Sequence, residues 1–247
     1  MASVKDLSIG IKDKLNKKYA SDAKKLELVA ISLEYVFKKM NEKKKDKVTN
    51  TYVDALNINE FFIYSKIIEI IENGFALDGI NYVIYSNAMV LPTYHAFKNK
   101  IYMVYHESVI DLQLIREGDE YNFAKESGSV VYSHSIADPF TVEEPKIIGA
   151  YCIIKNSRGE FLETLNLTDF QKMKSITKSV QAWNNWESEF WKKSVIKRAC
   201  KTHFHDITKD IDAQDNEGSD IEKFVKADES TKSSIIEAKK AQNESRA

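Results

Sequence analysis

The sequence has few of the residues that mark disulfide-rich, collagen-like or membrane-spanning proteins. Its 247 residues include two cysteines, three prolines and eight glycines. Two cysteines are too few for a disulfide framework, and they favour a reducing compartment. No apolar run approaches the roughly 18–20 residues that a membrane span requires, and no signal-peptide pattern opens the chain. We therefore expect a cytoplasmic protein that does not cross a membrane.

The glycines are scattered along the chain, and no GxxxxGK segment occurs. That segment is the loop whose backbone N–H groups cradle nucleotide phosphates, so its absence argues against a P-loop ATPase. We accordingly expect no nucleotide cofactor.

The net charge of −1 hides an uneven distribution of charge. Counting Lys and Arg against Asp and Glu, the net charge is +6 over residues 1–50, −9 over 51–170, +6 over 171–205 and −4 over 206–247. The overall charge says nothing about partners, but each of the two basic blocks can face a polyanion.

Helical and strand patterns follow one another along the chain and predict an α+β fold. Helices are expected near residues 22–40, 59–73 and 93–101, from Thr168 onward, and over 185–204. Ser21 and Asp22 can cap the first of these helices. Its apolar stripe, with spacings of three and four, consists of Leu26, Val29, Leu33, Phe37 and Met40. Strands are expected near residues 82–85, 88–91, 109–114, 121–123, 131–134, 147–154 and 161–167. The last two are expected to form a hairpin that turns at residues 156–159. The expected order is therefore helices, then an antiparallel sheet, then helices.

Three parts are expected along the chain. Residues 1–20 are lysine-rich and weakly periodic, which predicts a flexible N-terminus. Residues 21–205 form the folded domain. Residues 206–247 are acidic and poor in aromatic residues, so we expect a largely disordered tail.

The helix expected over residues 185–204 separates into two faces. At about 100° per residue, Lys193, Lys197 and Lys201 share one stripe, and Trp186 and Phe190 lie at its head. Apolar residues occupy the opposite side, which is therefore the packing face. A row of positive charge beside aromatic rings suits a nucleic-acid backbone with bases stacked on the rings. A solvated lysine face is the alternative, and it is the commoner fate of such a stripe.

Other chemistry is poorly supported by the residue pattern. His203 and His205 lie two apart with Asp206 beside them, but no further metal ligand is identifiable. Cys152 and Cys200 are expected to be small buried residues rather than nucleophiles.

Carboxylates near residues 111–120 raise the alternative of a metal-dependent nuclease. Asp111, Glu117, Asp119 and Glu120 gather there, but a nuclease needs carboxylates that converge on a metal. Turn geometry and solvation explain this cluster.

Four blocks of the sequence resemble the RecT family of phage single-strand annealing recombinases. The blocks are GFALDGINYVIYSN (residues 74–87), REGDEYNF (116–123), GAYCIIKNSRGEFLETLNLTDFQKMKS (149–175) and WNNWESEFWKKSVIKR (183–198). They stand in the family's order at similar spacing, and the resemblance covers roughly residues 61–204. The chain departs from the family pattern at Pro92, at the Thr93–His95 step and at Lys197, which replaces one of two paired arginines.

The resemblance implies a β-β-β-α core, assembly into rings or helical filaments, and ATP-independent annealing of complementary strands without covalent catalysis. It also implies single-stranded DNA and annealed duplex DNA as ligands, with a partner exonuclease and a host single-strand-binding protein nearby. Magnesium is expected to assist by screening phosphates, without a dedicated site.

The DNA contacts that follow from the basic helix and the resemblance form two groups. The expected phosphate contacts are Lys174, Lys178, Lys193, Lys197, Arg198 and Lys201. Tyr94, His95 and Lys98 are expected to line the other wall of a groove. For Trp183 and Trp186, anchoring the helix and touching DNA remain equally open.

Two further questions concern the whole chain. A structural assembly protein that does not bind DNA is an alternative to annealing, and a salt-sensitive gel shift with oligonucleotides separates the two.

The acidic tail can compete with DNA for the basic face. We expect its deletion from about Asp210 to leave the folded core intact.

Overall fold

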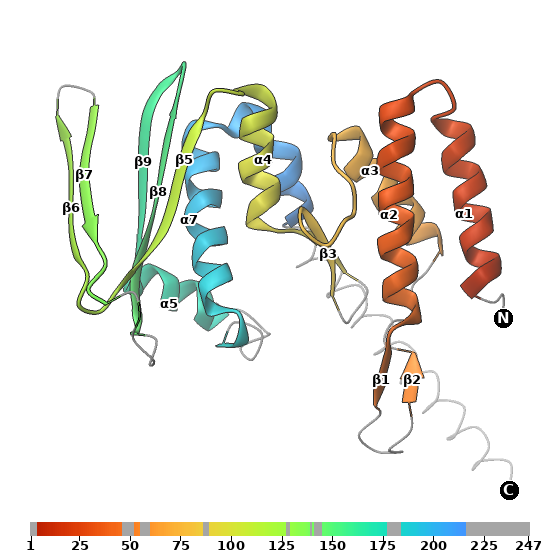
Figure 1. Cartoon of the computed structure of the whole chain (residues 1–247), viewed down its shortest axis with the longest axis horizontal. Coiled ribbons are helices and arrows are strands. Elements are labelled where there is room, and N and C mark those ends of the chain that lie inside the picture. The colour runs from red at the N-terminus through yellow and green to blue at the C-terminus, as the bar shows by residue number, and fades with distance from the viewer. Residues whose placement is uncertain are drawn as a thin grey trace, which may run out of the picture.

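The computed structural model confirms the α+β class (Figure 1). It describes residues 4–45, 52–54, 60–85, 89–126, 129–138, 140, 145–176 and 184–215. The helices are α1 (Val4–Lys18), α2 (Ala23–Asn41), α3 (Glu60–Glu72), α4 (Tyr94–Val104), α5 (Leu167–Ile176) and α7 (Glu187–His203). The strands are β1 (Lys43–Lys45), β2 (Tyr52–Asp54), β3 (Tyr82–Ile84), β4 (Val90–Pro92), β5 (Val109–Arg116), β6 (Glu120–Glu126), β7 (Ser129–Ser135), β8 (Ile147–Asn156) and β9 (Gly159–Asn166).

The N-terminal end of the molecule is a group of three helices, α1, α2 and α3 (Figure 1). Asp22 caps α2, as the sequence predicted, by accepting a hydrogen bond from the Lys25 backbone N–H at 3.0 Å. The expectation of a flexible segment over residues 1–20 is not met, because α1 buries Ile11 and Leu15 against its neighbours. These two residues lie four apart, which is a helical spacing that the lysine-rich composition obscured.

The sheet at the centre of the fold has the strand order β5-β8-β9, and all its pairs are antiparallel. The β8–β9 hairpin turns between Asn156 and Gly159, as the sequence predicted, and Gly159 adopts φ +129°. Both faces of β8 are covered, so its residues form a nearly continuous buried run. Ala150 and Cys152 belong to the main core, whereas Tyr151 and its face belong to a second, smaller cluster.

Helix α7 packs across β8 and β9 (Figure 1). It carries Trp191, the largest fully buried side chain among the described residues. The Trp191 ring stacks on Phe170 of α5 with 3.9 Å between ring centroids. The packing face of α7 consists of Trp191, Val195, Ile196, Ala199 and Cys200, all buried. The division of this helix into a packing face and a polar face, expected from the sequence, is thereby confirmed.

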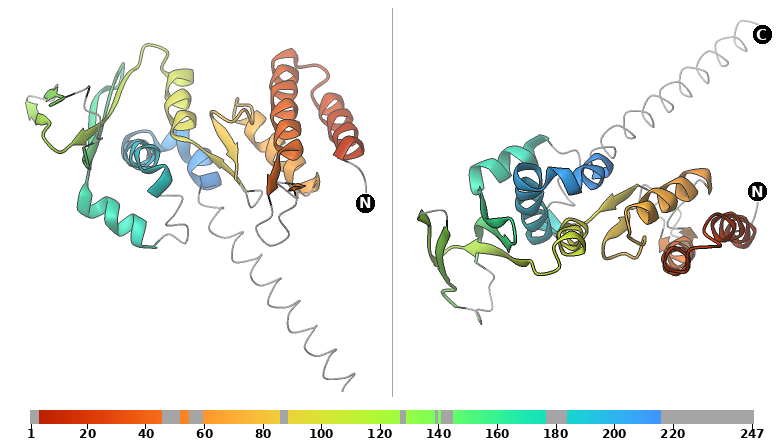
Figure 2. Two further views of the ribbon diagram at one scale, coloured as in Figure 1. Left: turned by 60° about the horizontal axis from the view of Figure 1, so that its bottom comes forward. Right: turned by 90° about the horizontal axis from the view of Figure 1, so that it is seen from above.

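The β6–β7 hairpin covers the other face of the sheet and lies at the opposite end of the molecule from the N-terminal helices (Figures 1 and 2). A series of polar contacts connects the hairpin to the sheet. His134 lies 3.1 Å from Asp119 and 3.3 Å from the Tyr151 hydroxyl, which in turn donates to Asp111 at 3.3 Å.

The largest departure from the sequence-based expectation lies at residue 206. Residues 205–215 are helical and packed against the core, rather than part of a disordered tail (Figure 2). Ile211 is fully buried, and the Tyr82 hydroxyl donates a hydrogen bond to the Gln214 side chain at 2.6 Å. The folded domain therefore extends at least to Asp215. The remainder of the expected tail lies outside the described residues.

None of the helices in the described part of the chain is long and apolar enough to cross a membrane.

Candidate nucleic-acid interface

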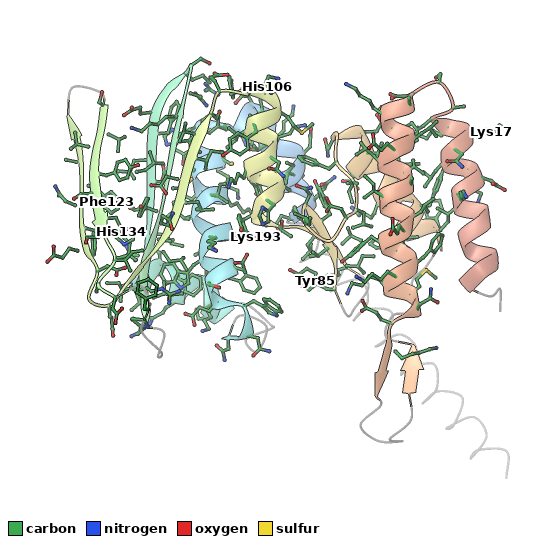
Figure 3. The ribbon with its side chains drawn as sticks, viewed as in Figure 1. Lys17, Tyr85, His106, Phe123, His134 and Lys193 are labelled. Atoms are coloured by element: carbon green, nitrogen blue, oxygen red, sulfur yellow. The ribbon has the colours of Figure 1, made fainter. Side chains whose placement is uncertain are left out.

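A cleft of about 800 Å³ lies between the N-terminal helices and the start of α7. One wall comes from α2 and residues 79–85, and the other comes from the first turns of α4 and α7. Figure 3 labels one residue from each wall, Tyr85 after β3 and Lys193 on α7.

Aromatic rings and cations line this cleft together. The rings are Tyr35, Tyr85, Tyr94, His95, Trp186 and Phe190, and the cations are Lys38, Lys39 and Lys193. Two carboxylates, Glu42 and Glu189, lie among them, and Glu42 pairs with Lys39 at 2.9 Å. Flat rings with scattered positive charge can stack bases and attract phosphates at the same time.

Gly79 fits the N-terminal wall to the Tyr35 ring. It adopts φ +81°, and a Cβ at this position would lie 2.6 Å from Tyr35. The ring can therefore lie against the backbone only because residue 79 has no side chain. The Tyr35 hydroxyl then accepts a hydrogen bond from the Ile84 backbone N–H at 3.3 Å, which connects α2 to β3.

The first turn of α4 places two rings in the opposite wall. Thr93 caps the helix by accepting a hydrogen bond from the His95 backbone N–H at 3.1 Å. The rings of Tyr94 and His95 then lie 4.0 Å apart, centroid to centroid, and the Lys192 ammonium group lies 5.6 Å from the Tyr94 centroid. Burial, together with the nearby Lys98, lowers the pKa of His95. A neutral His95 ring is thus suited to contacts with bases rather than phosphates.

Trp186 stands at the start of α7 with 65% of its surface exposed. Its backbone carbonyl accepts a hydrogen bond from the Phe190 N–H at 3.0 Å, whereas its side chain makes no cap. The structure therefore gives Trp186 no anchoring role in the core, which was one of the two alternatives left open by the sequence. Trp183 lies outside the described residues.

The lysine stripe of α7 is occupied by carboxylates from residues 205–215. Lys193 lies 2.5 Å from Asp215, Lys197 lies 2.7 Å from Asp215 and 3.1 Å from Asp212, and Lys201 lies 3.3 Å from Asp212. The stripe was predicted as a row of phosphate contacts. Of its three lysines, only Lys193 also lines the cleft.

The other predicted contacts do not converge on the cleft. Arg198 turns toward β9 and α5, where it donates to the Thr164 carbonyl at 3.0 Å and to Asp169 at 3.2 Å. Lys174 lies 4.0 Å from Glu187, and the Lys98 ammonium group lies 6.0 Å from the centre of the Tyr102 ring. Lys178 lies outside the described residues. Tyr94 and His95 do line the cleft, and their contact with DNA stays a prediction.

Of the nine rings and cations that line the cleft, four were missed by the sequence reasoning: Tyr35, Lys38, Lys39 and Tyr85. Three of them lie on α2, on the side of the helix away from its predicted apolar stripe. A tyrosine and two lysines on the polar side of a helix give no signal by themselves. They become a site only when the chain brings α2 opposite α7.

The residues considered for a metal or nuclease site form hydrogen bonds and ion pairs within the fold instead. Asp119 accepts backbone hydrogen bonds from Arg116 at 2.7 Å and Ala137 at 3.1 Å, in addition to its contact with His134. Across the described residues, no group of three or more His, Cys, Asp or Glu side chains is arranged to hold a metal ion.

The C-terminal end of α7 shows the same pattern. His203 lies 3.0 Å from Glu163, and Asp206 pairs with Arg158 at 3.3 Å. Cys152 and Cys200 are buried, as expected, and burial raises the pKa of each thiol.

The described part of the chain is an α+β protein whose antiparallel sheet and helices support a cleft lined by aromatic rings and lysines. The RecT family model matches residues 82–233, which is more than half of the chain, and the chain belongs to the RecT family. The match begins at β3 and includes residues 205–215, while α1, α2 and α3 precede it. Searches of curated proteins and of solved structures found no match.

Proposed function

We propose that this chain holds single-stranded DNA in the cleft and anneals complementary strands as a homo-oligomer, without a nucleotide cofactor. Membership of the RecT family supports the annealing reaction. The observation that carries the proposal for the cleft is its lining, in which six rings and three lysines face one space.

The cleft has the chemistry that an unpaired strand requires. A ring can stack any base, and each stacked base contributes roughly 1–3 kcal/mol. Lysine is a flexible point charge without base preference, so Lys38, Lys39 and Lys193 suit contacts with phosphates of any sequence. A strand held in this way keeps its sequence available for pairing.

Annealing forms no covalent bond, so we expect no catalytic residue. The repulsion between two polyanions has to be screened, and base pairing then supplies roughly 1.4 kcal/mol for each stacked step. Magnesium assists by screening phosphates, without a site of its own.

Assembly extends this chemistry along a strand. One cleft of about 800 Å³ accommodates only a short piece of DNA. A ring or filament of chains presents many such clefts in line and thereby lowers the cost of the search for a complement. In this setting a partner exonuclease supplies the single strand, and a host single-strand-binding protein competes for it.

The test compares Trp186→Ala with Phe61→Ala in full-length protein. Both side chains are largely exposed, 65% and 79% respectively, but only Trp186 lines the cleft. Anisotropy of a labelled oligonucleotide should show roughly 5- to 150-fold weaker binding for Trp186→Ala, corresponding to the loss of about 1–3 kcal/mol of stacking. Phe61→Ala should bind like the wild type.

Equal affinities for the two variants would exclude the cleft as the binding site. Complete absence of oligonucleotide binding by the wild type at low salt would favour the alternative of an assembly protein that does not bind DNA. Degradation of the oligonucleotide in the presence of magnesium or manganese would instead favour the nuclease.

A further inference from the structure

The lysine stripe of α7 is neutralised from within the chain. Asp212 and Asp215, three residues apart on one helix, hold Lys193, Lys197 and Lys201 as ion pairs. The two carboxylates therefore occupy positions that phosphate groups would take on an open stripe.

These ion pairs are largely removed from water. The side chains of Asp215 and Asp212 are 11% and 14% exposed, and those of Lys193 and Lys197 are 16% and 20% exposed. Burial acts to raise the pKa of Asp215, and the charges of the two lysines hold it below its ordinary value. Asp215 is thus an anion held beside the cleft.

The helix that carries the carboxylates is held by more than charge. Ile211 is fully buried, and Gln214 accepts the hydrogen bond of the Tyr82 hydroxyl. These contacts stabilise the position of the helix independently of the ion pairs. The carboxylates can therefore be tested one at a time.

Lys193 is the point at which the ion pairs and the cleft meet. Its ammonium group contacts Asp215, and its side chain also lines the cleft beside Trp186 and Phe190. A phosphate in the cleft and the Asp215 carboxylate thus compete for the same cation.

We propose that Asp212 and Asp215 set the affinity of this chain for single-stranded DNA by holding the lysine stripe in internal ion pairs. This inference rests on the proposed function. Each lysine released to a phosphate adds about 0.7 to the slope of log affinity against log salt on a single strand. An annealing protein must let strands move while complements are tested. By competing for the lysines, the two carboxylates keep the affinity for phosphates low enough to allow this movement.

The primary variant is Asp215→Asn, with Asp210→Asn as its matched control. Both variants remove one negative charge from the same helix, but Asp210 is exposed and is not part of the ion-pair network. At low salt, Asp215→Asn should bind a labelled oligonucleotide about threefold or more tightly than the wild type, with a salt slope steeper by about 0.7. Asp210→Asn should stay within about twofold of the wild type.

A second variant, Asp212→Asn, keeps the inference testable if Asp215→Asn unfolds the protein. In Asp212→Asn, Lys197 keeps Asp215 as its partner, and Lys201, whose side chain is 49% exposed, can be solvated. The same increase in affinity and slope is expected. If a folded variant binds as weakly as the wild type, or more weakly, the inference is overturned while the proposed function stands.

Amine labelling provides a measurement that does not depend on DNA. Lys193 should react slowly with an acylating reagent in the wild type and in Asp210→Asn, and faster in Asp215→Asn. Equal labelling of Lys193 in all three proteins would show that Asp215 does not hold it, and would overturn the inference. If no version binds DNA at any salt concentration, the proposed function fails and the inference fails with it.

Discussion

Lys197 differs from an ordinary surface lysine because it is shared by two carboxylates that are largely removed from water. It contacts both Asp212 and Asp215, and each of these keeps a second lysine as a partner. Removal of one partner from an isolated buried ion pair costs about 3–5 kcal/mol, because the other charge is left uncompensated. The sharing within this network should reduce that cost.

We predict that Lys197→Ala lowers the free energy of unfolding by about 2–3 kcal/mol, somewhat less than the loss for an isolated buried pair. Urea denaturation followed by circular dichroism measures the change. Lys209→Ala, at an exposed position nearby, is the control and should change stability by less than about 0.5 kcal/mol. A loss as small as the control's would mean that the network is solvated rather than buried.

The pKa of Asp215 gives a second prediction for a single residue. The folded pKa is depressed, so Asp215 contributes stability that is present above its unfolded pKa of about 3.9 and is lost as pH falls through the folded value. Asp215→Asn removes this contribution. The stability of the variant should therefore fall less steeply than that of the wild type as the solution is acidified below pH 4, roughly. If the melting temperatures of the two proteins fall equally with decreasing pH, the depressed pKa of Asp215 is contradicted.

At the scale of elements, the helix of residues 205–215 joins parts of the fold that are distant in sequence. It connects to β3 through Tyr82 and Gln214, and to α7 through the ion pairs. The expectation that deletion from Asp210 spares the core therefore needs revision. That deletion removes Ile211, Gln214 and both carboxylates.

We predict that a chain ending at residue 209 loses at least about 3 kcal/mol of stability, because it loses a buried isoleucine and a buried hydrogen bond. A chain ending at Asp215 keeps these contacts and should melt within a few degrees of the full-length protein. Thermal melting of the two truncations distinguishes the two boundaries. Equal melting temperatures would return the boundary to residue 206.

At the scale of the whole molecule, the hydrophobic core supports the fold, and the cleft provides the proposed binding surface. The sheet, α4, α5, α7 and the three N-terminal helices share one main hydrophobic core, and the cleft lies between α2 and the start of α7. The family match begins at β3, so α2 supplies its ring and lysines to the cleft from outside the matched region.

We predict that full-length protein anneals complementary oligonucleotides without ATP. Magnesium and calcium should accelerate annealing to similar extents, because screening of phosphates depends on ionic charge rather than on a coordination site. Energy transfer from a donor dye on one strand to an acceptor dye on the other follows the reaction. A requirement for ATP, or a strict requirement for one divalent ion, would contradict the mechanism.

The sequence by itself determined the class of protein and most of the local elements, but not α1, β1, β2 or the helix of residues 205–215. The apolar spacing of α2 and α7, the cap at Asp22 and the hairpin at Gly159 are signals within a few residues of one another, and all are present in the structure. The family resemblance also depended on the order of local blocks, which a linear reading preserves. Periodicity reports which face of an element is buried, but not which element covers it.

Tertiary structure alone decided which cations are available to a ligand. Lys193 and Asp215 are 22 residues apart, and composition assigned them to separate basic and acidic blocks. Phe204, Ile207 and Ile211 lie at helical spacing and were a signal for the final helix, but the acidic average of the segment masked it. Because the energy of an ion pair depends on distance and burial, a row of lysines becomes a binding surface or an internal clamp only once the chain has folded.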